Sequence, residues 1–265
     1  VLLSICVALV VIGGIKRISS VSQVVVPFMA VAYVVVVLII LLTHLGEIPG
    51  AFRTIIESAF GLRAAAGGAL GAVLIAMQKG IARGIFSNEA GLGSAPIAAA
   101  AAQTKEPVRQ GLVSMTGTFI DTIVICTLTG LSIVLTGAWQ VEGLEGVEVT
   151  TYAYQQGLPF PPAVSSFVLM LCLVFFAFTT ILGWDYYSER CLEYLSGGNL
   201  KHVKVYRWIY IFAVFIGPYM TVSAVWTIAD IFNGLMALPN MIALFALSGV
   251  VVRETKAFFK KQSGK

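Results

Sequence analysis

Polar and glycine residues interrupt an otherwise apolar stretch of this sequence at residues 86–94, FSNEAGLGS. Ser87 and Asn88 can both donate and accept hydrogen bonds, and Gly91 lets the backbone approach a ligand closely. In hydrocarbon a broken helix leaves backbone N–H and C=O groups without partners, so such breaks occur where they line a cavity or hold a ligand. The stretch therefore predicts a binding site, although a kink packed against a neighbouring helix gives the same pattern.

The two helix halves that flank the interruption are expected to offer opposite partial charges. The first half should end near Ile85 and Phe86 with free carbonyl groups, which suit an ammonium group or a cation. The second half should begin near Gly91 to Gly93 with free N–H groups, which suit a carboxylate. An amino acid carries both groups, so it matches this pair of helix ends.

Arg83, Glu89, Asp121 and Asp185, in or next to apolar segments, are candidates for structural or gating roles. If Asn88 lies at the bilayer centre, a helical rise of ~1.5 Å per residue places Arg83 about 7 Å away, where it needs an acidic partner. We expect one of the three acids to supply it. Structural or gating ion pairs and direct substrate contact both remain open, and Asp121 also suits a cation or proton relay.

Two adjacent hydroxyl groups, those of Thr179 and Thr180, lie in a segment rich in phenylalanine. Paired hydroxyl oxygens suit an alkali cation, but threonines within a helix also donate to their own backbone carbonyls. Trp184 follows Thr180 by four residues and therefore shares its helix face. The indole could cap a small cavity or lie in the aromatic belt of a membrane interface.

The composition indicates a polytopic membrane protein. Of the 265 residues, 58% are hydrophobic and 11% are charged, whereas about a quarter of the residues of a soluble domain are charged. The four cysteines are widely separated, so they predict neither a metal site nor a disulfide. The sequence shows no nucleophile–base pair or phosphate-binding loop, which argues against an enzyme. The net charge of +4 lies in loops and the tail and is not typical of nucleic-acid binding.

Seven apolar segments reach or approach the length of a membrane-spanning helix. They cover residues 1–15, 24–42, 64–102, 111–138, 163–184, 208–226 and 227–252. Because Val1 already lies in an apolar run, we expect the first segment to be truncated and the N-terminus of the parent protein to be missing. The last segment is expected to be interrupted at Asn233-Gly234 and at Pro239, as a bend or a gate. Residues 43–63 are predicted to hold an amphipathic helix.

The distribution of lysine and arginine predicts the orientation, because cytoplasmic loops carry an excess of these residues. Three basic loops and the tail are assigned to the cytoplasm: residues 16–17, 105–109, 190–207 and 253–265. The connector at 43–63 and the acidic loop at 139–162 are assigned to the outside. The expectation is a multi-pass protein of the plasma membrane with a cytoplasmic C-terminus.

Five segments resemble the alanine/glycine:cation symporter family, the sodium:alanine symporters. They are GIARGIFSNEAGLGSAPIAAAAA (80–102), PVRQGL (107–112), FIDTIVICTLTGL (119–131), FTTILGWDYYSERCLEYL (178–195) and ADIFNGLMALPN (229–240). The resemblance runs along the whole chain. It implies an all-α, leucine-transporter-type fold of two inverted five-helix repeats, here incomplete, with about seven transmembrane helices and one of them broken. It assigns 1–42 to the end of the first repeat, 43–63 to a connector, 64–252 to the second repeat and 253–265 to a basic tail.

The resemblance also implies sodium-coupled symport of a small neutral amino acid, alanine or glycine, by alternating access, with no cofactor beyond the coupling ion. Thr179 and Thr180 would hold sodium. The amino acid would contact residues of two helices, namely Phe86, Ser87, Asn88, Gly91 and Trp184. Two alternatives stay open: a proton-coupled carrier that uses Asp121 or Asp185, and a channel or ligand-sensing membrane protein.

Overall fold

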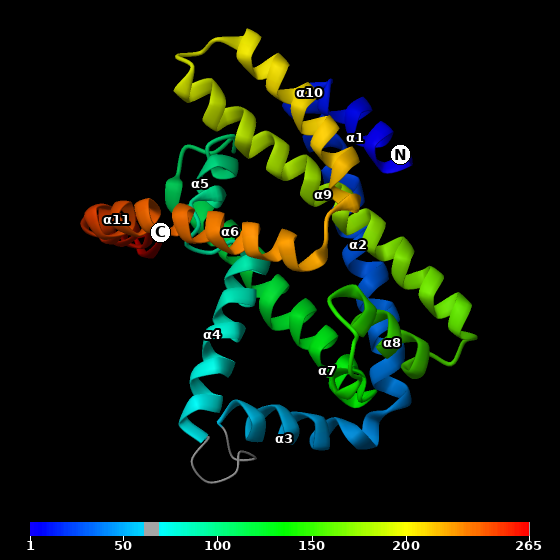
Figure 1. Ribbon diagram of the computed structural model, residues 1–265. Coiled ribbons are helices and arrows are strands. Elements are labelled where there is room, and N and C mark those ends of the chain that lie inside the picture. The colour runs from blue at the N-terminus through cyan, green and yellow to red at the C-terminus, as the bar shows by residue number, and fades with distance from the viewer. Residues whose placement is uncertain (61–68, 265) are drawn as a thin grey trace. The chain divides into compact units, whose positions relative to one another are not determined.

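The computed structural model describes residues 1–60 and 69–264, and every regular element in these ranges is a helix (Figure 1). Four of the helices are long and apolar enough to cross a membrane: Gly14–Thr43, Pro107–Leu135, Pro162–Leu195 and Val222–Ser263. These helices fit a multi-pass membrane protein. The seven spans and the inverted repeats stay predictions, and the predicted boundary at residues 63 and 64 lies outside the described residues.

The chain divides into two compact units. The first unit comprises Val1–Ala72 and Thr127–Val222, and the second comprises Val73–Cys126 and Ser223–Lys265. Of the residues singled out from the sequence, the second unit holds the polar interruption at 86–94 and Asp121. The first unit holds Thr179, Thr180, Trp184 and Asp185.

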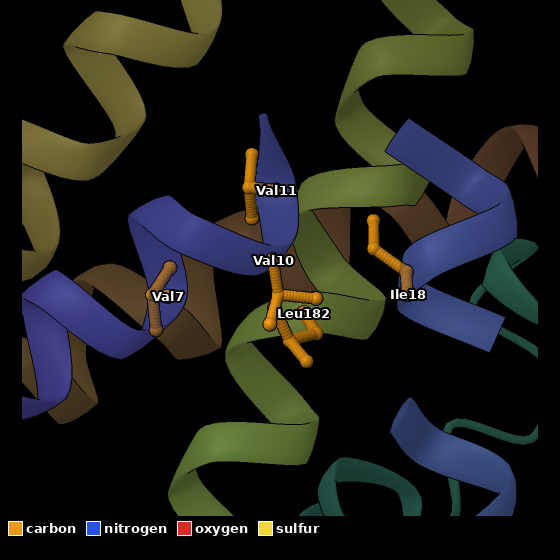
Figure 2. Close-up of a cluster of buried hydrophobic side chains, with 5 residues drawn as sticks. All are labelled: Val7, Val10, Val11, Ile18 and Leu182. Carbon is orange, nitrogen blue, oxygen red and sulfur yellow. The ribbon is translucent and has the colours of Figure 1, made fainter. Parts of the chain in front are cut away.

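In the first unit, α9 is the central helix, because it contacts α1, α2, α8 and α10 (Figure 1). Its helices are α1 (Leu2–Val11), α2 (Gly14–Thr43), η1 (Leu45–Glu47), α3 (Ile48–Ala59), α7 (Thr127–Leu135), η3 (Ala138–Gln140), α8 (Val147–Gly157), α9 (Pro162–Leu195), α10 (Leu200–Ile216) and η4 (Gly217–Tyr219). A buried apolar cluster joins α1 and the start of α2 to α9 (Figure 2). Its members are Val7, Val10, Val11, Ile18 and Leu182.

Helix α3 lies within the predicted connector and is amphipathic. Ala51 is buried, and α3 contacts α7. Phe52 and Ile56 are exposed by 43% and 52%, which leaves an apolar face that suits the bilayer surface. On the polar face Arg53 donates to Glu57 at 2.6 Å, and this hydrogen bond raises the pKa of Arg53 above its ordinary value.

The second unit contains α4 (Ala69–Asn88), α5 (Ser94–Ala99), α6 (Pro107–Phe119), the π-helical segment η2 (Ile120–Cys126) and α11 (Val222–Ser263). The expected interruption of the last segment is wrong, because α11 runs continuously past Asn233, Gly234 and Pro239. An internal proline removes one backbone hydrogen bond of the helix, and a membrane helix tolerates this when neighbouring groups satisfy the freed carbonyl. The helix also continues into the predicted tail as far as Ser263.

Two further boundaries differ from the sequence prediction. The segment predicted at 208–226 ends early, since α10 stops at Ile216 and the Gly217–Tyr219 turn follows. Pro218 has no N–H to continue the helix ladder, so the chain turns and α11 begins at Val222. The predicted outer loop at 139–162 contains the helix α8, in which Ala153 and Tyr154 are fully buried.

Candidate functional site

The polar interruption is a true break between α4 and α5. The backbone takes left-handed φ values at Glu89 (55°), Gly91 (85°) and Gly93 (89°), and these interrupt the right-handed helix. The predicted end of the first half at Ile85 and Phe86 is wrong, because α4 continues to Asn88. The N–H of Glu89 still donates to the Ile85 carbonyl at 2.9 Å.

The second half of the broken segment is shorter than expected. Helix α5 covers only Ser94–Ala99, whereas the sequence predicted a helix that begins at residues 91–93 and runs to Ala102. Few aligned peptide dipoles contribute to its N-terminus. The predicted carboxylate-binding helix end therefore loses most of its physical support, and side chains at the break become the more important binding groups.

The two polar side chains of the break that were predicted to bind substrate both contact η2. Ser87 Oγ donates to the Asp121 carboxylate at 2.8 Å from Oδ2 and 3.0 Å from Oδ1. Asn88 Nδ2 donates to Thr122 Oγ1 at 2.8 Å. A π-helical turn displaces side chains from regular helical positions and occurs frequently at functional sites. The structure thus brings Ser87, Asn88 and Asp121 together in the second unit.

Local hydrogen bonds hold the rest of the break in place. The Ala90 N–H donates to Asn88 Oδ1 at 2.9 Å, and the buried Ser94 donates its hydroxyl hydrogen to Glu89 Oε2 at 2.6 Å. Glu89 therefore stabilises the start of α5. The expectation that Glu89, Asp121 or Asp185 pairs with Arg83 is wrong.

Arg83 instead pairs with Asp230 of α11, a residue that the sequence reasoning missed. Its Nη2 lies 2.6 Å and 2.5 Å from the two carboxylate oxygens. The guanidinium also lies 4.2 Å from the ring centroid of Trp226 and 5.8 Å from that of Phe86, in cation–π geometry. Phe86, which was expected to contact substrate, packs on Trp226 with centroids 4.8 Å apart. An acid inside an apolar segment was the signal for Asp230.

Asn240 of α11 is the second functional residue that the sequence reasoning missed. Its Nδ2 donates to the Gly91 carbonyl at 2.9 Å, which satisfies one of the backbone acceptors freed by the break. A Cβ atom added to Gly93 would lie 3.3 Å from the Asn240 Cβ. The tight contact and the left-handed φ of Gly93 together explain the glycine at this position.

In the first unit, the predicted sodium ligands lie on α9. Thr179 Oγ1 lies 3.1 Å from the carbonyls of Phe175 and Phe176, so its hydrogen is directed to its own helix. This is the local alternative noted from the sequence, but the oxygen lone pairs stay available to a cation. Thr180 is exposed.

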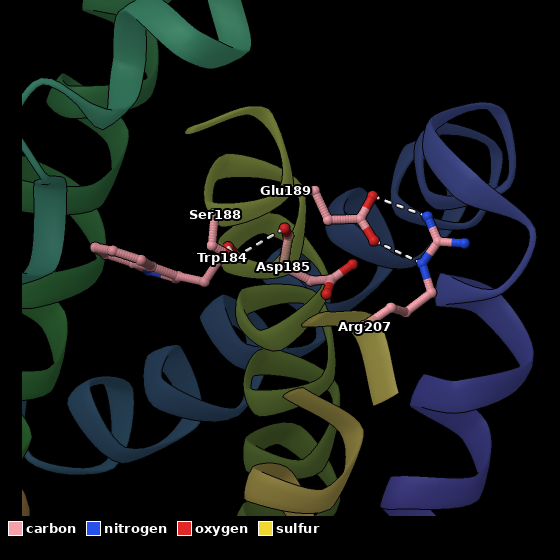
Figure 3. A network of polar contacts seen from close by, with 5 residues as sticks. All are labelled: Trp184, Asp185, Ser188, Glu189 and Arg207. Atoms are coloured by element: carbon pink, nitrogen blue, oxygen red, sulfur yellow. Dashed lines mark hydrogen bonds and ion pairs between the residues drawn. The ribbon is translucent and has the colours of Figure 1, made fainter. Parts of the chain in front are cut away.

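Trp184 and Asp185, also on α9, point to opposite sides of the helix (Figure 3). The Trp184 indole packs edge-on to the Tyr187 ring at 5.8 Å. Asp185 is fully buried near the Glu189–Arg207 ion pair. Within the described residues, no group of three or more His, Cys, Asp or Glu side chains is placed to hold a metal ion.

Comparison with known proteins places the chain in a family. The model of the sodium:alanine symporter family matches residues 1–265. The chain is 54% identical over 262 residues to an uncharacterized transporter of Haemophilus influenzae, a match that covers 98% of this chain and 57% of that protein.

Two further relatives carry more specific names. The sodium/alanine symporter AgcS of Methanococcus maripaludis is 48% identical over 259 residues, covering 97% of this chain and 55% of AgcS. The probable sodium/glutamine symporter GlnT of Bacillus subtilis is 38% identical over 257 residues, covering 97% and 52%. The chain thus spans about half the length of the curated relatives it matches. These relatives are transporters and not enzymes, and the match of the family model from end to end shows that the chain belongs to the sodium:alanine symporter family.

Proposed function

We propose that this chain forms part of a secondary active transporter that moves a small neutral amino acid, alanine or glycine, together with sodium by alternating access. The observation that carries the proposal is the break between α4 and α5, where Ser87 and Asn88 meet the π-helical η2. Family membership and the sodium/alanine name of AgcS support the choice of ion and substrate.

The polar groups at the break suit a zwitterion. Ser87 uses its hydrogen toward Asp121, so its lone pairs and the carboxylate together favour an ammonium group. Asn88 Nδ2 uses one of its two hydrogens toward Thr122 and keeps the other for a substrate carboxylate. Glycines at 91 and 93 add no side-chain bulk, and the Phe86–Trp226 pair lies beside the break. These features favour a small side chain on the substrate.

Sodium coupling is tested by uptake of labelled alanine into proteoliposomes that contain the complete transporter. We expect an inward sodium gradient to drive accumulation above equilibrium, and we expect collapse of the gradient to abolish it. Uptake that ignores sodium would refute the coupling. Excess unlabelled glycine should compete, whereas glutamine, the substrate in the name of the relative GlnT, should not. Strong competition by glutamine would refute the proposed size limit.

Thr180→Ala tests the proposed sodium ligands. Loss of one neutral oxygen ligand is expected to cost about 1 kcal/mol, or a roughly five- to tenfold higher sodium concentration for half-maximal uptake. Thr180→Ser is the matched control, because it keeps the hydroxyl and should keep a sodium requirement close to that of the unmodified protein. An unchanged sodium requirement in Thr180→Ala would remove Thr180 from the site.

A proton-coupled carrier is the second candidate, and the burial of Asp185 inside a membrane-spanning helix favours a role for protons. Uptake driven by a pH gradient in the absence of sodium would support it. A channel would instead give ionic conductance that does not saturate with substrate, and a sensor would bind alanine without flux.

A further inference from the structure

Asp185 is buried without a hydrogen-bond partner. Its side chain is 0% exposed, and neither carboxylate oxygen has a partner among the described residues. Removing an ionised carboxylate from water costs several kcal/mol unless a cation or hydrogen-bond donors compensate it. Since α9 is one of the four helices able to cross a membrane, this residue needs a compensating group.

The nearest cation is already paired. Arg207 Nε and Nη2 donate to the two carboxylate oxygens of Glu189 at 2.6 Å and 2.9 Å (Figure 3). Glu189 lies one helical turn after Asp185 on α9, so both acids lie near the same guanidinium. Because Glu189 balances the charge of Arg207, an ionised Asp185 would leave this buried cluster with one net negative charge.

The other groups that face Asp185 supply no counter-charge. From α10, Tyr206 and Tyr210 lie close enough to interact with it electrostatically. The Tyr210 hydroxyl donates to the Ile181 carbonyl at 2.8 Å. This part of α9 packs against α1 and the start of α2 through the apolar cluster of Figure 2. Lys16 and Arg17, in the first turn of α2, are exposed. Helix α8 contacts the far end of α9, where Gln155 bonds Ser166.

We propose that Asp185 is a proton-binding site, which stays protonated as long as Arg207 pairs with Glu189. A proton is the occupant that fits, because the two oxygens are enclosed by protein. A sodium ion would need several more oxygen ligands around them. One arginine can compensate only one of two carboxylates that lie a turn apart on the same helix, and the other acid then keeps the proton.

The role of this proton in transport rests on the proposed function. Helix α9 also carries Thr179, Thr180 and Trp184, so a change in the charge of Asp185 acts on the helix that would hold sodium. Proton binding would therefore make sodium-driven uptake depend on pH. The protonation itself can be measured without sodium, substrate or flux, which separates the failure of this inference from the failure of the proposed symport.

The experiment is infrared difference spectroscopy of the purified, complete transporter across a pH titration. A protonated carboxyl group gives a carbonyl band that is absent from carboxylates. We expect this band at neutral pH in the unmodified protein and its loss in Asp185→Asn. We also expect its loss in Glu189→Gln, because Arg207 then needs a new counter-charge and Asp185 supplies it. Glu193→Gln, which removes the partner of the partly buried Arg190 on α9, is the matched control and should keep the band.

The experiment can contradict the proposal in three ways. The absence of the band from the unmodified protein at neutral pH, its persistence in Asp185→Asn, or its persistence in Glu189→Gln would overturn the proposal. Should Asp185→Asn fail to fold, the unmodified protein and Glu189→Gln still provide the test. In proteoliposomes with a sodium gradient, alanine uptake by Asp185→Asn should lose its dependence on external pH, and a retained dependence would refute the role in transport.

Discussion

Asp230→Asn is expected to destabilise the protein by about 1.5–3 kcal/mol, the usual contribution of a hydrogen bond to a charged group. The substitution removes the negative charge of the carboxylate that pairs with Arg83 Nη2. The guanidinium stays beside Trp226 without a counter-charge. Thermal unfolding in detergent should show the loss of stability, and alanine uptake should fall with it, because Phe86 and the break adjoin this cluster.

The double variant Arg83→Gln with Asp230→Asn tests whether the unpaired charge of Arg83 causes the loss of stability. It removes both charges, so it should recover most of the stability that Asp230→Asn alone loses. Recovery should stop about 0.5–1 kcal/mol short, since the cation–π contact with Trp226 is also lost. Arg53 and Glu57 on α3 form the control pair, with side chains exposed by 79% and 22%, against 38% and 48% for Arg83 and Asp230. The control differs because α11 is long and apolar enough to cross a membrane and α3 is not. Neutralising Glu57 should change stability by less than about 0.5 kcal/mol. Equal losses from both pairs, or a double variant as unstable as the sum of the single variants, would contradict this account.

Gly93→Ala is expected to disrupt the break and abolish most of the uptake. A left-handed backbone costs a residue with a Cβ atom roughly 1–2 kcal/mol. The added atom would also press on Asn240 at 3.3 Å, which threatens the hydrogen bond from Asn240 to the Gly91 carbonyl. The combined effect should appear as a larger loss of uptake and thermal stability than backbone strain alone produces.

Substitutions of two other glycines of the same region distinguish the backbone strain from the contact with Asn240. Gly91 also has a positive φ, 85°, but an added Cβ would meet no atom within 4 Å, so Gly91→Ala measures the backbone strain alone. Gly84 lies inside α4 with free space around it, so Gly84→Ala should be neutral or stabilise the helix by about 0.5–1 kcal/mol. If Gly93→Ala loses no more stability and uptake than Gly91→Ala, the contact with Asn240 does not contribute to the effect.

The sequence located the break well because the signal is local. A run of Ser, Asn and Gly in an apolar segment cannot continue a membrane helix without special partners, and the structure breaks within the predicted residues 86–94. The ends of the two halves were misplaced by a few residues. The N–H of Glu89 still bonds the Ile85 carbonyl, so α4 extends to Asn88, a detail that composition does not specify.

The partners of the break were less predictable, because they lie far away in the sequence. Arg83 and Asp230 are separated by 147 residues, and Gly91 and Asn240 by 149. Sequence pattern shows that Arg83 needs an acid but does not rank the acids, since packing brings one of them into reach. Pro239 and its neighbours suggested an interruption of the last segment. The continuous α11 instead uses Asn240 to bond the broken helix.

The left-handed conformation of Glu89 has a consequence for how the chain can move. Among the residues described, Glu89 alone has a side chain and a positive φ, and this conformation costs roughly 1–2 kcal/mol. The Ser94 hydroxyl, 2.6 Å from its carboxylate, offsets part of that cost. Loss of the Ser94 contact would favour the return of Glu89 to a right-handed φ, whereas Gly91 and Gly93 keep their left-handed φ values without a steric cost. The break is therefore a strained segment that the hydrogen bond from Ser94 to Glu89 helps to hold in place.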